Sequence, residues 1–206
     1  NEGVNPKQII VTGNTVVDAL YDHIELCEKS KLLKKLKTAS NEYILVTAHR
    51  PENVDIKPRL SKLISLIEHA AIKLKKKVLF PIHPRTKNKL SEFDIKISKN
   101  ITLIDPVGYI DMLSLLKNAY LVMTDSGGVQ EEAYILKKPL LTLRDSTERP
   151  ETLSANFIID NSKKKFNEGW KCFKNNTVSW DNSFGDGTAS KIIVDRLLEK
   201  KLWKKP

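Results

Sequence analysis

Short apolar runs alternate along this chain with longer segments that carry apolar residues at spacings of three and four. The short runs are rich in valine, isoleucine and leucine, as is typical of strands buried on both faces; they fall at residues 43–46, 78–82, 101–104, 121–124, 140–143 and 157–159. Segments of helical period fall between most of them, at residues 16–36, 58–74, 110–117, 129–136, 164–173 and 189–202. Because this alternation produces parallel strands joined by crossover helices, the sequence predicts a doubly wound α/β domain with a parallel sheet.

The chain has 206 residues, enough for one compact domain that needs neither disulfides nor metals. Cys27 and Cys172 make neither a disulfide framework nor a zinc pattern, and the first residues show no basic segment followed by an apolar one. No apolar run approaches the roughly 20 residues needed to cross a bilayer. We therefore expect a reduced, soluble, cytoplasmic protein with no membrane partner.

The formal net charge of +10 is concentrated in lysine runs, such as residues 75–77 and 163–165. Such runs either bind nucleic acid or mark solvated helix ends, where lysine complements the helix macrodipole. No aromatic residues are interleaved with these lysines, and no RNA-binding motif or zinc-finger spacing accompanies them. We favour solvated helix ends and expect no nucleic acid partner, although a positive field would attract an anionic ligand.

Polar residues gather directly after several of the expected strands. His49 and Arg50 follow the first strand, His83 follows the second, and residues 144–151 bring arginines and carboxylates after the fifth. In doubly wound sheets, ligands bind beyond the carboxyl ends of the strands. The sequence therefore predicts one shared site at this edge, with His49 suited to serve a phosphate or a proton transfer.

Residues 121–133 have the pattern of a buried strand, a Ser-Gly-Gly turn and a helix that carries acidic residues. Glycine lets the backbone approach a ligand, and the unpaired N–H groups of a helix's first turn bind anions. A nucleotide diphosphate fits this pattern, because Glu131 or Glu132 could accept hydrogen bonds from ribose hydroxyls. The alternative is an ordinary strand–helix connection in which Asp125 or Ser126 caps the helix.

Six motifs follow one another along nearly the whole chain. Four are His-Arg-Pro-Glu-Asn (49–53), Pro-Ile-His-Pro (81–84), Asp-Ser-Gly-Gly-Val-Gln-Glu-Glu-Ala (125–133) and Arg-Asp-Ser-Thr-Glu-Arg-Pro-Glu (144–151). Val-Thr-Gly-Asn-Thr-Val-Val-Asp-Ala (11–19) and Gly-Asp-Gly-Thr-Ala (185–189) flank them. Each motif is weak alone, but in this order the set resembles the non-hydrolysing UDP-N-acetylglucosamine 2-epimerase family.

The resemblance implies a Rossmann-like domain that forms the carboxyl-terminal half of a two-domain, GT-B-type architecture. Residues 1–20 resemble the family's interdomain crossover, residues 21–185 the UDP-binding domain, and residues 186–206 a C-terminal helix that packs toward the amino-terminal domain. In the family that other domain supplies a Gly-Thr-Arg-Pro-Glu loop and the carboxylates that move the C2 proton, and no such segment occurs in this sequence. Without it, apolar positions on the helices at both ends of the chain should be exposed, with Leu202 and Trp203 as our candidates.

For the complete enzyme, the resemblance implies reversible inversion at C2, which interconverts UDP-N-acetylglucosamine and UDP-N-acetylmannosamine. The family eliminates UDP to leave a 2-acetamidoglucal intermediate and then adds UDP back, which requires acid–base groups and a pyrophosphate clamp but no cofactor and no metal. The expected partners are the UDP-sugar, the amino-terminal domain and, since members are often dimers, a second copy. The isolated half is expected to bind UDP and to catalyse nothing.

Two alternatives to an epimerase half remain open at this point. One is a stand-alone nucleotide-sugar-binding module, which would use the same site. The other is half of a GT-B glycosyltransferase, against which the segment Thr-Glu-Arg-Pro-Glu (147–151) argues.

By matching position, the resemblance identifies the residues that bind substrate: Ser126, Gly127, Gly128, Glu132, Arg144, Glu148 and Arg149. The Ser-Gly-Gly turn holds the diphosphate, Glu132 holds the ribose, and the arginines and Glu148 belong to a signature that faces the sugar-diphosphate cleft. His49 lies beside the phosphates as the candidate catalytic residue that assists departure of UDP. His83 falls where some bacterial members use a histidine to bind a second, regulatory UDP-N-acetylglucosamine.

Two positions qualify this transfer of roles. Arg149 could instead be a structural ion-pair partner of Glu148 or Glu151. Pro51 stands where the family often has a second arginine, which removes one phosphate or carboxylate contact. The resemblance also implies that uracil lies against the loop at residues 105–112.

Overall fold

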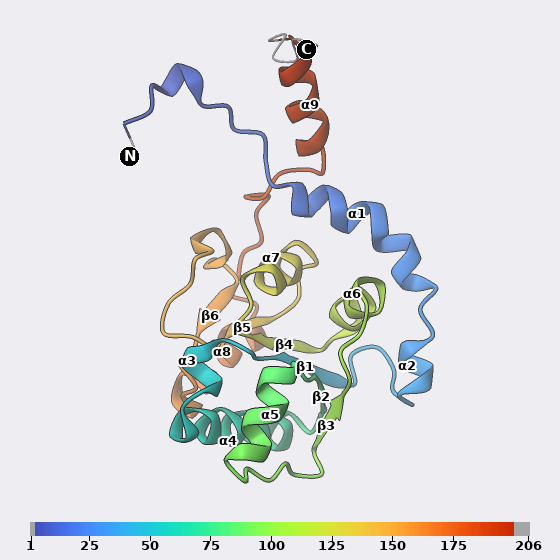
Figure 1. The fold of residues 1–206 in the computed structure, drawn as a ribbon, viewed down its shortest axis with the longest axis vertical. Helices are drawn as coiled ribbons and strands as arrows, with labels where there is room; N and C mark the ends of the chain where they lie inside the picture. Colours follow the sequence, from blue (N-terminus) through green and yellow to red (C-terminus); the bar gives the residue numbers. More distant parts are fainter. Residues whose placement is uncertain (1–2, 200–206) are drawn as a thin grey trace.

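A six-stranded parallel sheet forms the centre of the computed structural model, which describes residues 3–199 (Figure 1). The strands are β1 (Tyr43–Thr47), β2 (Lys77–Pro81), β3 (Ile101–Ile104), β4 (Leu121–Thr124), β5 (Leu140–Thr142) and β6 (Asn156–Ile158). They lie in the order β3-β2-β1-β4-β5-β6, and every neighbouring pair is parallel. The predicted doubly wound α/β sheet is confirmed, with all six strands at the expected places.

Helices cover both faces of the sheet (Figure 1). One face packs on α4 (Lys57–Leu74), α5 (Pro84–Glu92) and α8 (Lys163–Lys174). The other packs on α2 (Leu32–Lys35), α6 (Tyr109–Asn118) and α7 (Gly127–Ile135). Outside these layers, α1 (Thr15–Glu28) lies on α6 and α7, while α3 (Pro51–Val54) is a single turn after β1. Short 3-10 turns at Pro6–Gln8 and Pro150–Thr152 and the final helix α9 (Ala189–Glu199) complete the described elements.

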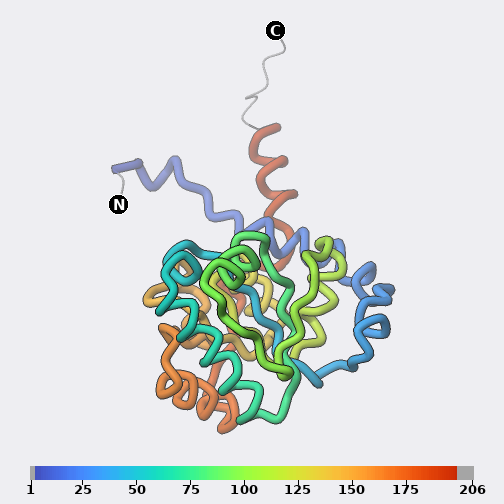
Figure 2. Tube along the Cα trace, turned by 60° about the horizontal axis from the view of Figure 1, so that its bottom comes forward, coloured from blue at the N-terminus to red at the C-terminus, as the bar shows by residue number. Residues whose placement is uncertain are grey.

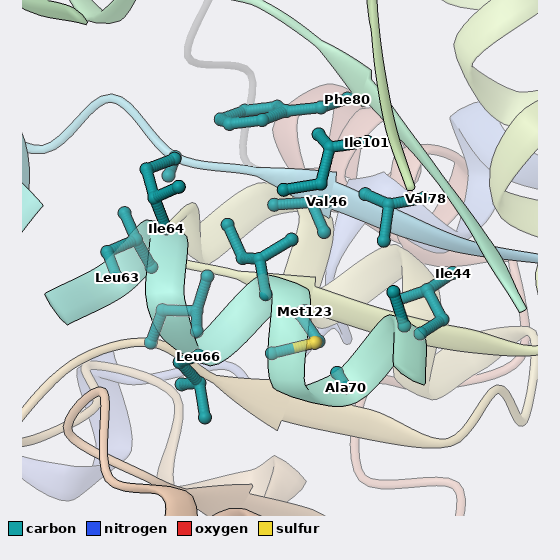
Figure 3. Close-up of a cluster of buried hydrophobic side chains, with 14 of the residues drawn as sticks. Ile44, Val46, Leu63, Ile64, Leu66, Ala70, Val78, Phe80, Ile101 and Met123 are labelled. Atoms are coloured by element: carbon teal, nitrogen blue, oxygen red, sulfur yellow. The ribbon is translucent and has the colours of Figure 1, made fainter. Parts of the chain in front are cut away.

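Side chains of each strand alternate between these two helical layers. Ile44 and Val46 of β1 point toward α4, where they meet residues such as Leu63 and Ala70 (Figure 3). The intervening Leu45 packs in the opposite cluster with residues of α6 and α7. Because both faces are buried, the strands are continuously apolar rather than alternating with polar residues, which is why they stand out in the sequence.

Two predictions about the helices require correction. Residues 16–36 are not one helix, because α1 ends at Glu28 and α2 begins at Leu32. In the break between them, Ser30 Oγ donates a hydrogen bond to Asp111 at 2.6 Å and accepts one from the Leu32 N–H. The crossover helix α5 was not predicted, because only Thr86 and Leu90 of its nine residues are buried and the apolar period is too weak to recognise.

The two ends of the described chain leave the body of the domain on the same side (Figures 1 and 2). Val11, which precedes α1, is 92% exposed. The helices at both ends expose apolar side chains, as predicted, with Leu198 of α9 65% exposed. In α1, Tyr21 is also half exposed. The candidates Leu202 and Trp203 lie outside the described residues. Among residues 3–199, no helix has the length and apolar character required to cross a membrane.

Gly169 allows α8 to approach the sheet closely, and we expect Gly169→Ala to destabilise the fold. A Cβ at this position would lie 2.9 Å from both Leu141 Cδ2 and Phe157 Cβ, closer than real contacts permit. The overpacking should lower the free energy of unfolding by about 1–3 kcal/mol, although alanine is the better helix former. Urea denaturation measures the loss. In the control Gly108→Ala, the new Cβ meets no heavy atom within 4 Å, so little change is expected; equal stability of the two variants would contradict the packing argument.

Candidate functional site

The carboxyl ends of β1 and β4 lie side by side at the point where the strand order reverses. In open α/β sheets this switch point is where ligands bind. Thr47 at the end of β1 and Thr124 at the end of β4 join their hydroxyls at 2.6 Å, and the Thr124 hydroxyl also accepts the Ser126 N–H at 2.9 Å. These bonds fix how the chain leaves both strands, and therefore where His49 and Ser126 lie.

Asp125 is fully buried between the two strand ends. Its carboxylate accepts the N–H groups of His49 at 3.1 Å and Arg50 at 3.0 Å, and the Asn53 side-chain amide at 3.0 Å. Asp125 therefore does not cap α7, which corrects one alternative drawn from the sequence. Ser126 occupies the N-cap position, but its hydroxyl makes no capping hydrogen bond.

The first turn of α7 presents backbone donors at the switch point. The first N–H groups of a helix have no intrahelical acceptor, which makes this turn an anion site. Gly127 and Gly128 do not have positive φ, so backbone conformation does not require glycine at either position. A Cβ at Gly128 would meet no heavy atom within 4 Å. Neither conformation nor internal packing explains Gly128, whereas close approach of a ligand would.

A cavity of about 230 Å³ opens beside this turn. Its walls are mostly apolar and come from the loops after β1, β2 and β3 and from α6 and α7: Thr47, Ala48, His49, Pro81, Ile82, His83, Pro84, Pro106, Val107, Met112, Ser126 and Val129. The rings of His49 and His83 stack in it with centroids 5.3 Å apart. His83 is held by the Arg85 N–H, which donates to its Nδ1 at 3.1 Å. A flat apolar ring in this cavity would lie next to the anion site.

His49 has a protonation state set by opposing neighbours. Burial lowers its pKa most, and the positive influence of His83 and Arg50 lowers it further. Asp125 and, more weakly, Glu52 raise it, with Asp125 Oδ1 lying 3.5 Å from His49 Nδ1. The net effect is a pKa below the ordinary histidine value, so the free imidazole is neutral at pH 7.

Glu132 lies in α7, about one turn after Gly128, on the side of the helix that packs on α6. Burial raises the pKa of its carboxyl group above the usual value, and a hydrogen bond from the Tyr109 hydroxyl opposes that rise. Burial and the adjacent Glu132 charge raise the pKa of Tyr109 to about 12. The sequence predicts Glu132 as a binding residue, and this stays a prediction. The contact with Tyr109 was not predictable, because the two residues meet only through the packing of α6 on α7.

A second cavity of about 420 Å³ lies on the other side of α7's first turn, between the N-terminal segment and the loop after β5. Arg149 lines it and pairs with Glu131, Nε to Oε1 at 2.6 Å. The predicted structural alternative for Arg149 named the wrong partner, since its ion pair is with Glu131 and not with Glu148 or Glu151. Asn14 also donates to the Glu131 carboxylate at 3.1 Å, so Glu131 is occupied by internal partners.

Arg144 and Glu148 belong to the same loop and pair with each other at 3.2 Å. Arg144 Nε lies 3.4 Å from Glu52, a residue of the His-Arg-Pro-Glu-Asn segment. Five of the predicted site residues line the two cavities: His49, His83 and Ser126 line the apolar one, and Glu148 and Arg149 line the polar one. Gly128, Glu132 and Arg144 are not among the residues that line either cavity. Gly127 connects the two groups of lining residues, because a Cβ there would lie 3.6 Å from the Arg149 guanidinium.

Tyr109→Phe is expected to raise the pKa of Glu132 further. The tyrosine hydroxyl donates to the ionised carboxylate and lowers its pKa, so its removal leaves burial unopposed. The carboxyl carbon shift of Glu132, followed by NMR through a pH titration, measures the change. Tyr120→Phe is the control, because Tyr120 packs on Trp170 and Lys76 instead. An unchanged or lower Glu132 midpoint in Tyr109→Phe would show that the hydroxyl does not support the carboxylate.

The parallel strand order and the glycine-rich turn at the switch point define a Rossmann-like domain. Residues 1–198 match the family model described as UDP-N-acetylglucosamine 2-epimerase. The chain belongs to this family, as its motifs predicted.

Two curated relatives carry the same description. The chain is 43% identical over 202 residues to "UDP-N-acetylglucosamine 2-epimerase" of Methanocaldococcus jannaschii, with 94% of this chain and 55% of the relative covered. It is 44% identical over 211 residues to that of Methanococcus maripaludis, with 97% and 57% covered. A crystal structure of the Methanocaldococcus jannaschii UDP-GlcNAc 2-epimerase in complex with UDP-GlcNAc and UDP matches with a TM-score of 0.86 at 42% identity, over 96% of this chain and 57% of that one.

The chain thus spans a little over half the length of the relatives it matches. Its fold corresponds to one half of a longer two-domain protein, as predicted. The family match also decides against the alternative of a glycosyltransferase half.

Proposed function

We propose that this chain is the UDP-binding half of a UDP-N-acetylglucosamine 2-epimerase. The observation that carries the proposal is Gly128 in the first turn of α7, which neither conformation nor packing explains, beside an apolar cavity at the switch point. A phosphate placed on this turn would receive backbone donors and the favourable end of the helix dipole. The structure of the relative that contains UDP-GlcNAc and UDP supports this choice of ligand.

In the proposed complex the diphosphate lies on Ser126, Gly127 and Gly128. Uracil occupies the cavity of about 230 Å³, against Pro106, Val107 and Met112. Glu132 accepts hydrogen bonds from the ribose. The sugar extends toward the second cavity, where Arg149 and Glu148 lie.

His49 lies between the apolar cavity and Asp125, and we assign it the role of assisting departure of UDP. Loss of UDP from C1 places additional negative charge on the diphosphate. An imidazole that takes up a proton beside that group would stabilise the charge. The ring of His83 stacks on that of His49. We propose that His83 has the regulatory role that the resemblance implies, binding of a second UDP-N-acetylglucosamine.

The activity proposed for the complete protein is interconversion of UDP-N-acetylglucosamine and UDP-N-acetylmannosamine. The carboxylates that move the C2 proton in the family come from the amino-terminal domain. We propose residues 1–20 as the crossover to that domain, residues 21–185 as the UDP-binding domain and residues 186–206 as the helix that contacts the other half. Exposed Val11 and Leu198 would be covered in that assembly. On this account the isolated chain binds UDP and has no epimerase activity.

Calorimetric titration with UDP and UMP tests the proposal. UDP should bind at least tenfold more tightly than UMP, because a charge-assisted hydrogen bond contributes about 1.5–3 kcal/mol and UMP lacks the second phosphate. Ser126→Ala and Glu132→Ala should each weaken UDP binding by roughly tenfold. Ser61→Ala and Glu25→Ala, on exposed faces of α4 and α1, are the matched controls. Equal affinity for UDP and UMP, or equal losses in the controls, would refute the diphosphate clamp.

A further inference from the structure

Asp125 carries a charge at a fully buried position, which is costly unless every oxygen is well paired. All of its donors come from the segment 49–53: two backbone N–H groups and the Asn53 amide. The Asn53 amide also donates to the Leu143 carbonyl at 2.7 Å, and its oxygen accepts from Asn161 at 3.1 Å. Asp125 therefore joins the segments after β1 and β4, and Asn53 connects this pair to the segments after β5 and β6.

This arrangement determines which nitrogen of His49 faces the carboxylate. Nδ1 lies 3.5 Å from Asp125 Oδ1, and the backbone of the same residue is held by the same carboxylate. An ionised carboxylate only accepts hydrogen bonds, so it favours a proton on Nδ1. In a neutral imidazole the proton is then missing from Nε2, and the ring itself lines the apolar cavity.

We infer that Asp125 is a positioning residue that holds the His49 proton on Nδ1 and leaves Nε2 free to take up a second proton beside a bound diphosphate. The proton comes from solvent when the anionic ligand binds, and it returns to solvent on release. The imidazolium that forms lies between two anionic groups, the Asp125 carboxylate and the diphosphate. The identity of the ligand in this step rests on the proposed function, whereas the placement of the proton on Nδ1 does not.

The other charged groups around His49 lie on three elements. Arg50 and Glu52 belong to the loop after β1 and to α3, and His83 is at the start of α5. Arg50 and His83 lower the pKa of His49, while Glu52 raises it less than Asp125 does. Among the described residues, Asp125 is the carboxylate that forms an ion pair with the His49 ring.

The test is to determine the tautomer of His49 by long-range ¹H–¹⁵N NMR in the 206-residue chain without nucleotide. His49→Gln identifies the His49 signals among the four histidines. Above its titration midpoint, His49 should be protonated on Nδ1. Asp125→Asn should convert it to the Nε2-protonated form or to a mixture, and should move its midpoint to lower pH, since the Asp125 charge raises the pKa of His49. The control is Asp55→Asn, because Asp55 pairs with Arg85. This substitution should leave the tautomer and the titration midpoint of His49 unchanged.

An Nε2-protonated His49 in the unsubstituted chain would overturn the inference, and this result does not depend on whether any variant folds. An unchanged tautomer in a folded Asp125→Asn variant would overturn it as well. Addition of UDP to the unsubstituted chain at a pH above the midpoint should then protonate Nε2. If UDP does not bind at all, the proposed function fails and the tautomer result stands; if UDP binds and His49 stays neutral, the proton-uptake step is wrong.

Discussion

Leucine in place of Gly128 is expected to weaken UDP binding by roughly 10- to 100-fold without destabilising the fold. Side chains in a helix lean toward its N-terminus, so a side chain at this second helical position projects over the turn that we assign to the diphosphate. Displacing one charge-assisted hydrogen bond costs about 1.5–3 kcal/mol, which corresponds to this loss of affinity. In the free protein a Cβ at Gly128 meets no heavy atom within 4 Å, so a side chain can leave the backbone there without a clash at its first atom.

Two measurements on Gly128→Leu separate binding from folding. Calorimetry should show the loss of UDP affinity, and thermal unfolding should show an unchanged or higher midpoint, since glycine is a poor helix former. Lys164→Leu is the matched control, because Lys164 occupies the same second position of α8 and is exposed. Unchanged UDP affinity in Gly128→Leu would mean that the diphosphate does not lie on this turn.

Asp125→Ala is expected to lower the free energy of unfolding by about 3–5 kcal/mol. The substitution leaves two backbone N–H groups and the Asn53 amide without their acceptor at a buried position. Each unsatisfied buried donor costs about 1–3 kcal/mol, and removal of the buried charge offsets part of the sum. Against a typical stability of about 5–15 kcal/mol, this is among the largest effects a single polar substitution can have.

Urea denaturation of Asp125→Ala provides the measurement, with Asp55→Ala as the control. Asp55 pairs with Arg85 at a partly exposed position, so its loss should matter much less. If the two variants lost equal stability, the buried carboxylate would not be what holds the ends of β1 and β4 together.

The strands were predictable because the sheet is covered on both faces, which makes each strand a continuous apolar run. Helix α5 was not predictable in this way, because its exposed surface carries lysines and only Thr86 and Leu90 are buried. The break between α1 and α2 was also hidden, because neither glycine nor proline marks it. It depends instead on Ser30 and its partner Asp111, which is 81 residues away.

A strand-end position and a motif were enough to predict that His49 and Ser126 lie at the same edge of the sheet, and both line the apolar cavity there. The pairing within the site was not predictable in the same way. Arg149, in the loop after β5, forms an ion pair with Glu131 of α7. Asn161 donates a hydrogen bond to Asn53, which is 108 residues away in the sequence. Such contacts have no local pattern, because they depend on how the strands are ordered in the sheet.

The most direct test of the account is a UDP titration of the ¹⁵N-labelled chain followed by amide chemical shifts. We expect the largest changes at the N–H groups of Gly127, Gly128 and Val129 and around Met112, with UMP affecting the region of Met112 more than the first turn of α7. Changes confined to another part of the surface, such as the lysine-lined groove at Trp170 and Lys171, or no changes at millimolar UDP, would contradict the assignment of this chain as the UDP-binding half of an epimerase.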